Sequence, residues 1–129
     1  MMQRPRMHPG SVTIASAPER AEKLATFYRD LLGWPIVDSG PDGGWFQLRP
    51  PAGEDGMTIN IEEDHEYARP AWPSRPGEPS AVMHLDIGVE DLDAAVEWAQ
   101  SVGAVLAVEQ PQADVRVMID PDGHPFCLC

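Results

Sequence analysis

Residues 84–104 read HLDIGVEDLDAAVEWAQSVGA, and the fold that the sequence predicts follows from this stretch. Apolar and polar residues alternate from Met83 to Val89, as on a strand that buries one face. Asp91 then offers a carboxylate that can cap the first turn of a helix. An apolar stripe at helical spacing ends at Gly103: Leu92, Ala95, Val96, Ala99 and Val102. A strand followed by a helix is therefore predicted.

Three further strand candidates complete this half of the chain. They are Ala104–Val108, Val115–Ile119 and Phe126–Cys129. The last two are joined by Asp-Pro-Asp-Gly, residues 120–123, which favours a tight turn.

The first half repeats this order. Ser11–Ser16 alternates like a strand, and a helix over about residues 19–32 is predicted before Gly33, from the spacing of its apolar residues. Those residues are Leu24, Phe27, Tyr28, Leu31 and Leu32. Three short apolar runs follow, Trp34–Val37, Trp45–Leu48 and Met57–Ile61, separated by sequences rich in turn formers. The period of this repeat is about 70 residues.

A proline-rich stretch separates the two halves and predicts an extended, partly polyproline-like linker. We expect a single α+β domain over residues 1–129. It divides into a first βαβββ module at about 11–62, a linker at about 63–81 and a second module at about 82–129.

Charge and composition exclude several classes of partner. The chain has 9 Lys and Arg against 21 Asp and Glu, a formal net charge of -12, which disfavours nucleic acid and anionic membrane surfaces. No apolar run is long enough for a membrane span, and Met1–Gly10 has no apolar leader core. We expect a cytoplasmic protein. Cys127 and Cys129, two apart on a strand, are expected to stay reduced.

Three segments carry a resemblance to a known family: FYRDLLGW at 27–34, the opening stretch at 84–104, and DPDGHPF at 120–126. Together they resemble the vicinal oxygen chelate superfamily, which includes glyoxalase I, bleomycin-resistance proteins and extradiol dioxygenases. The PAWP linker and the HPFCL ending are similar to a mostly uncharacterised glyoxalase-like subgroup. The resemblance implies that the two modules form a cup-shaped, mostly antiparallel sheet with a central cleft, and that the protein is a homodimer.

Enzymes of this superfamily hold a divalent metal through one residue on the first and one on the last strand of each half. The positions of this sequence that match are Ser11 or Thr13, Glu62, His84 and Cys127. Glu62, His84 and Cys127 could bind a divalent metal, namely zinc, iron, manganese or nickel. Each residue also has an alternative, structural role. His84 could be a hydrogen-bonded core histidine, Glu62 a solvated residue at the rim of the sheet, and Cys127 a small buried apolar residue.

Aromatic and polar side chains give a candidate ligand pocket. It comprises Ser11, Thr13, Trp45, Asn60 and Trp72. Trp34 and Trp98 are expected to pack in the core, and His124, beside the predicted turn, is expected to be exposed.

Two functions remain open from the sequence. One is a metal-free module that binds and sequesters a small hydrophobic or cationic molecule in the cleft, as the drug-binding members of the superfamily do. The other is a metal-dependent lyase, isomerase or dioxygenase acting on vicinal oxygens, with Glu62 as a ligand or catalytic base. The identity of the ligand and the pairing of the modules, within one chain or across a dimer, are not determined by the sequence.

Overall fold

Each half of the chain forms a four-stranded sheet, and the strand order is the same in both. The computed structural model describes all residues, 1–129. The first half contains β1 (Ser11–Ser16), α1 (Ala21–Leu32), β2 (Ile36–Ser39), β3 (Trp45–Leu48) and β4 (Thr58–Glu63). The second half contains β5 (Asp86–Ile87), α2 (Leu92–Ser101), β6 (Val105–Leu106), β7 (Arg116–Ile119) and β8 (Pro125–Leu128). The sheets run β1-β4-β3-β2 and β5-β8-β7-β6.

The first and last strands of each half lie side by side and parallel, and the other neighbours are antiparallel. The predicted α+β fold of two βαβββ modules is confirmed. β5 and β6 are shorter than the runs predicted over 83–89 and 104–108. Both are edge strands, which find a pairing partner on one side only. No helix is long and apolar enough to cross a membrane.

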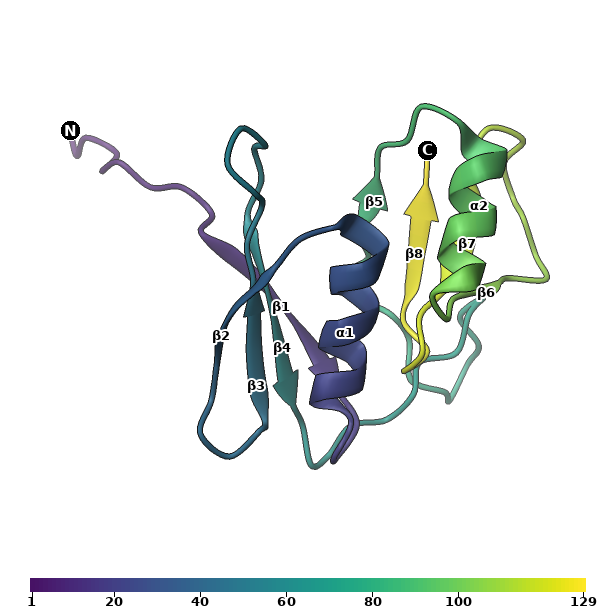
Figure 1. Cartoon of the computed structure of the whole chain (residues 1–129), viewed down its shortest axis with the longest axis horizontal. Coiled ribbons are helices and arrows are strands. Elements are labelled where there is room, and N and C mark those ends of the chain that lie inside the picture. The colour runs from purple at the N-terminus through teal and green to yellow at the C-terminus, as the bar shows by residue number, and fades with distance from the viewer.

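Helix α1 packs its buried face into a core shared by both modules. Figure 1 shows α1 between the first sheet and strands β5 and β8. The ring of Phe27 lies 6.0 Å from that of Phe126 on β8, and the ring of Tyr28 lies 6.4 Å from it. On the other side the core includes Ile59 and Ile61 of β4. The two modules are therefore joined through one cluster of 13 buried residues.

Helix α2 lies nearer the surface, and Trp98 does not pack in the core as expected. The residue is 53% exposed. The indole N–H instead donates to the carbonyl oxygens of Asp30 and Leu31, at 3.1 and 3.2 Å, at the end of α1. Trp98 lies on the side of α2 that faces α1, but at the edge of the contact between the two helices, where much of its ring stays in solvent. Trp34 does pack against the core.

The DPDG turn between β7 and β8 fastens the second module to the first. Asp122 accepts hydrogen bonds from Ala17 N and Arg20 Nε, both at 2.8 Å. Asp120 accepts one from the Tyr28 hydroxyl at 2.7 Å. Both carboxylates are buried, and burial of an unpaired charge is costly. These bonds therefore restrict how the modules sit against each other.

His124 belongs to the same network, contrary to the expectation that it is exposed. Its Nδ1 lies 2.8 Å from Asp120 Oδ2, and the side chain is 22% exposed. The ring of Tyr67, from the linker, lies 5.5 Å from the His124 ring, and its hydroxyl donates to the carbonyl oxygen of Asp122. The expectation was wrong because a tertiary contact with the linker covers the turn.

The linker is folded back on itself, so the expected extended path is also corrected. Ala71 N donates to Pro79 O at 2.8 Å, which closes a loop. A turn over residues 75–78 lies within it, with Arg75 Nη1 3.6 Å from Glu78 Oε2. Proline and glycine here favour turns as much as an extended chain. The loop places Trp72 against the second module.

Candidate functional site

Strand alternation leaves one face of each sheet turned away from the helices. On the first sheet, Ile59 and Ile61 of β4 face the core, so Asn60 and Glu62 face the other way. Asn60 accepts a hydrogen bond from Gln47 Nε2 at 2.9 Å, and its Nδ2 lies 3.5 Å from Thr13 Oγ1. This open face therefore carries a row of polar side chains across β1, β4 and β3.

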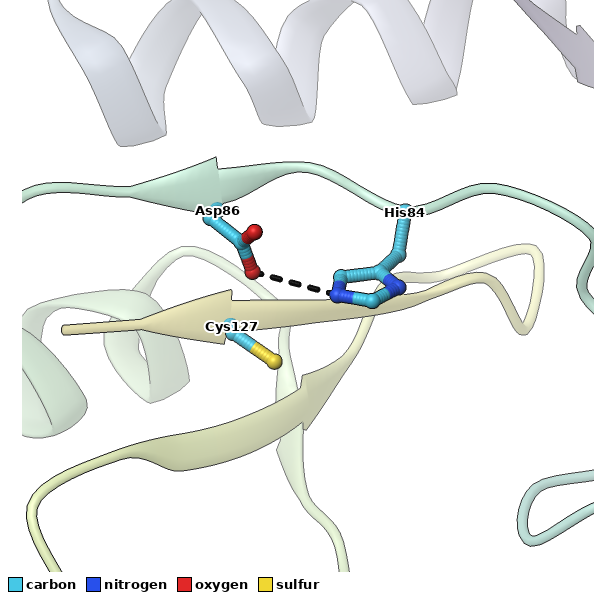
Figure 2. A group of neighbouring side chains, drawn as sticks. All are labelled: His84, Asp86 and Cys127. Atoms are coloured by element: carbon cyan, nitrogen blue, oxygen red, sulfur yellow. Dashed lines mark ion pairs between the residues drawn. The ribbon is translucent and has the colours of Figure 1, made fainter.

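The open face of the second sheet carries a compact group of possible metal donors. His84 Nε2 lies 3.1 Å from Asp86 Oδ1, and the donor atoms of His84, Asp86 and Cys127 all lie within 4.8 Å of one another. Figure 2 shows the three side chains, with Asp86 on β5, His84 just before it and Cys127 on β8. The parallel register pairs Asp86 with Cys127.

A cavity of about 200 Å³ adjoins this group. Its floor comes from β7 and β8, and its sides come from the linker and the segment before β7. The lining residues are Trp72, His84, Pro111, Gln112, Val115, Val117, Pro125 and Cys127. The lining is mainly apolar, and the polar groups of His84, Gln112 and Cys127 are the exceptions.

The environment of Cys127 favours the protonated thiol. Partial burial raises the pKa of Cys127 above its ordinary value, and the negative charge of Asp86 and a hydrogen bond to it raise the pKa further. A thiol with a raised pKa is a weak nucleophile at neutral pH. In the absence of a cation, the arrangement therefore does not favour nucleophilic catalysis by Cys127.

The other residues of the predicted site lie on the first module. Glu62 and Trp45 line a second cavity of about 380 Å³, together with Asp42, Gly44, Glu63 and His65. Ser11 and Thr13 lie on β1 and are exposed. The structure thus brings His84, Cys127 and Trp72 to one cavity and Glu62 and Trp45 to another, and it does not bring Glu62 into the donor group.

Asp86 is the donor that sequence reasoning missed. It lies two residues after His84 on an alternating strand, so the pattern itself puts both side chains on one face. The family resemblance implies only one metal ligand on each strand, which on this strand is His84, and so it did not indicate Asp86. Val117 and Pro125 also lie on the cavity floor, and they have no distinguishing signal in the sequence.

The donor group fits a divalent transition metal in its chemistry. Imidazole nitrogen, carboxylate oxygen and thiolate sulfur are the three ligand types that zinc prefers in proteins. Bond lengths of about 2.0 to 2.3 Å place two donors on one tetrahedral zinc ion roughly 3.3 to 3.6 Å apart. The observed upper limit of 4.8 Å is wider than this, and exposed His84 and Asp86 side chains are free to close the difference.

Solved structures share this fold over nearly the whole chain. An enzyme of the glyoxalase/bleomycin resistance protein/dioxygenase family from Burkholderia phytofirmans PsJN aligns with a TM-score of 0.65 at 16% identity, covering 92% of this chain and 94% of that one. TnmS3, an antibiotic binding protein from Streptomyces sp. CB03234, aligns with a TM-score of 0.60 at 21% identity, covering 98% and 97%. At these identities the likeness establishes the fold alone. A search of curated proteins gives no match.

Paired βαβββ modules are the fold that the resemblance to the vicinal oxygen chelate superfamily implies, and the family match agrees with that superfamily. Within it, this chain belongs to the family described as Glyoxalase-like domain, which matches residues 11–129. Membership of the superfamily, expected from the sequence, is confirmed.

Proposed function

We propose that this protein binds a small, mainly apolar molecule against the open face of the second module. The observation that carries the proposal is the cavity beside Trp72, whose lining combines apolar side chains with a few polar groups. Ligand pockets commonly have this composition, in which the apolar area gives affinity and the polar groups give orientation. The Streptomyces neighbour, an antibiotic binding protein, has the same fold and is consistent with a binding role such as sequestration.

The size and shape of the cavity indicate the kind of ligand. A volume of about 200 Å³ is smaller than that of most drug-sized pockets, so it suits one ring system or one end of a larger molecule. The indole of Trp72 favours a planar group. The net charge of -12 favours a cationic group on the same ligand. In the dimer proposed below, the second cavity of the partner chain would face this group, and its Trp45, Glu62 and Glu63 offer an aromatic face and carboxylates.

We also propose that two chains associate, and that the cleft forms between the open face of one chain's first module and that of its partner's second module. Each of the two cavities is lined by one half of the chain with its adjoining linker. Val82 and Met83, just before the edge strand β5, are 90% and 77% exposed, as apolar residues at an interface are in a lone chain. This proposal includes the division of the chain into modules at 11–62 and 82–129. It also includes a cytoplasmic location, and the two free thiols fit the reducing conditions of that compartment.

Ligand binding can be tested by tryptophan fluorescence and calorimetry with a panel of planar natural products, neutral and cationic. Replacing the ring in Trp72→Leu should weaken binding by roughly 1 to 3 kcal/mol if it anchors the ligand. Trp98→Phe is the matched control, because that indole lies on the helix side of the second module, and it should leave affinity unchanged. Equal affinity of Trp72→Leu and the wild type would exclude this cavity as the site.

A metal-dependent lyase, isomerase or dioxygenase is the second candidate, and the donor group at the cavity wall favours it. A divalent ion would supply polarisation of vicinal substrate oxygens. In this candidate His84 and Cys127 hold the ion, Trp72 orients the substrate, and Glu62, brought from the facing module, serves as a ligand or as the catalytic base.

A further inference from the structure

We propose that His84, Asp86 and Cys127 bind one zinc-class divalent cation within the second module, with Asp86 completing the set without Glu62. The proposal deepens the metal-dependent candidate, and it is independent of whether the cavity binds an organic ligand. Four observations support it: the backbone that holds the donors, their chemistry, their exposure and the position of Glu62.

The backbone fixes the three donors on one patch of sheet. Cys127 N donates to Leu85 O at 2.9 Å, the ladder bond that places Cys127 opposite Asp86 in the parallel register. The next bond of the ladder, from Cys129 N to Ile87 O at 3.0 Å, continues the same register. Strand alternation then directs His84, Asp86 and Cys127 to the same face. Sheet hydrogen bonds therefore determine the spacing of Asp86 and Cys127, and His84 lies two residues before Asp86, just outside β5.

The donor chemistry selects the class of cation. Magnesium and calcium prefer all-oxygen ligands, whereas a thiolate and an imidazole favour zinc, or cobalt used as its probe. A neutral imidazole, one carboxylate and one thiolate carry two negative charges, which match a divalent ion.

Exposure and cavity position indicate a site with room for a further ligand. The side chains of His84 and Asp86 are 49% and 63% exposed, so solvent reaches the site. His84 and Cys127 also line the cavity beside Trp72. Three protein ligands with one accessible position is the arrangement of catalytic zinc sites, whereas structural sites use four.

Glu62 is not needed for this set within the chain. It lines the other cavity, with Asp42, Trp45 and His65. The family resemblance implies ligands from both halves, whereas the geometry points to a complete three-donor set in one half. The two arrangements differ in which carboxylate a bound ion needs.

Cobalt titration of the metal-stripped full-length protein tests the proposal directly. A thiolate ligand gives a sulfur-to-cobalt charge-transfer absorption, and zinc added afterwards should abolish it by competition. We expect binding of one equivalent of cobalt and loss of the charge-transfer band in Cys127→Ser. The band should be retained in Cys129→Ser, the matched control, which removes the neighbouring thiol and keeps that of Cys127. Absence of the band in the wild type, or its loss in Cys129→Ser instead, would overturn the assignment.

The carboxylate is assigned by comparing two variants whose folding is checked by circular dichroism. Asp86→Asn should weaken cobalt affinity at least about tenfold, since even outer-shell partners of metal ligands cost that much. Glu62→Gln should leave affinity within about twofold of the wild type. The reverse ranking would replace Asp86 by Glu62 and refute a site contained in one module. Binding of a planar ligand to metal-free Asp86→Asn, measured by fluorescence, reports on the cavity separately, so failure of one proposal is distinguishable from failure of the other.

Discussion

Asp120 illustrates how single residues decide the assembly of this protein. Its carboxylate is buried and accepts hydrogen bonds from the Tyr28 hydroxyl and from the backbone N–H groups of Asp122 and His124. His124 Nδ1 provides a further contact. Each donor offsets part of the cost of removing the carboxylate from water. The turn motif therefore serves assembly of the two modules, and the candidate chemistry lies elsewhere.

Tyr28→Phe should destabilise the protein and change how its stability depends on pH. Removal of the hydroxyl leaves Asp120 one donor short, at a cost of about 1 to 3 kcal/mol. In the wild type, burial first and then the charge of Asp120 raise the pKa of Tyr28 well above its ordinary value of 10.0. The folded protein therefore keeps a proton that the unfolded chain loses, and stability falls as the pH rises above 10.0.

Urea unfolding of both proteins from neutral pH to about pH 11 measures this effect. The alkaline loss of stability should be shallower in Tyr28→Phe. Tyr67, whose pKa is also raised, chiefly by burial, remains in both proteins and contributes equally. Parallel curves for the two proteins would contradict the role assigned to Tyr28.

At the scale of elements, the two helices end and begin by different means. Gly33, at a φ of 69°, ends α1 with its N–H bonded to Arg29 O at 2.8 Å. Asp91 begins α2 by accepting a hydrogen bond from Ala94 N at 3.1 Å, whereas α1 begins without a side-chain cap. Helix α1 is held by its buried face. Helix α2 buries less and so depends more on its cap.

Asp91→Ala should therefore lower the free energy of unfolding by about 1 kcal/mol. Asp93→Ala is the matched control, because it removes an acidic side chain from the same first turn without removing the cap. Its effect should stay within about 0.5 kcal/mol. Urea midpoints give the comparison, and hydrogen exchange along α2 shows whether the loss is local. Equal effects of the two variants would mean that charge, and not capping, stabilises this end of the helix.

At the scale of the whole molecule, one chain leaves both open sheet faces without a facing module. The shared core around Phe27, Tyr28 and Phe126 joins the modules on their helix sides. The proposed ligand cavity and the second, acidic cavity lie on faces that this core does not join. In the proposed dimer, a second chain would supply the second wall of the cleft.

Light scattering should give a mass near twice the 14.1 kDa of one chain at micromolar concentration. Because each chain carries a net charge of -12, added salt should strengthen association by screening the repulsion. Met83→Lys should shift the equilibrium to the monomer, since it places a charge beside β5. Val108→Lys changes a fully exposed apolar residue beyond the opposite edge strand, β6, and should not. A mass of one chain for the wild type would refute the dimer.

The order and type of the elements were determined by the sequence itself. Apolar spacing of three and four residues indicates both helices, and alternation indicates which side chains of a strand share a face. On β4, the alternation of Ile59 and Ile61 with Asn60 and Glu62 corresponds to a buried face and an open face. These properties depend on backbone period and local turn chemistry, which a few neighbouring residues are sufficient to set.

Only the tertiary structure decided which faces meet. The period of a strand does not say what lies opposite it. The family resemblance grouped Glu62 with His84, whereas within one chain they line different cavities. The folded linker brings Trp72 to His84 and Cys127, and Tyr67 of the same linker contacts the DPDG turn. The contribution of Asp86 depends on the parallel register of β5 and β8. Each of these follows from contacts between residues distant in sequence, and their free energy is settled only when the whole chain packs.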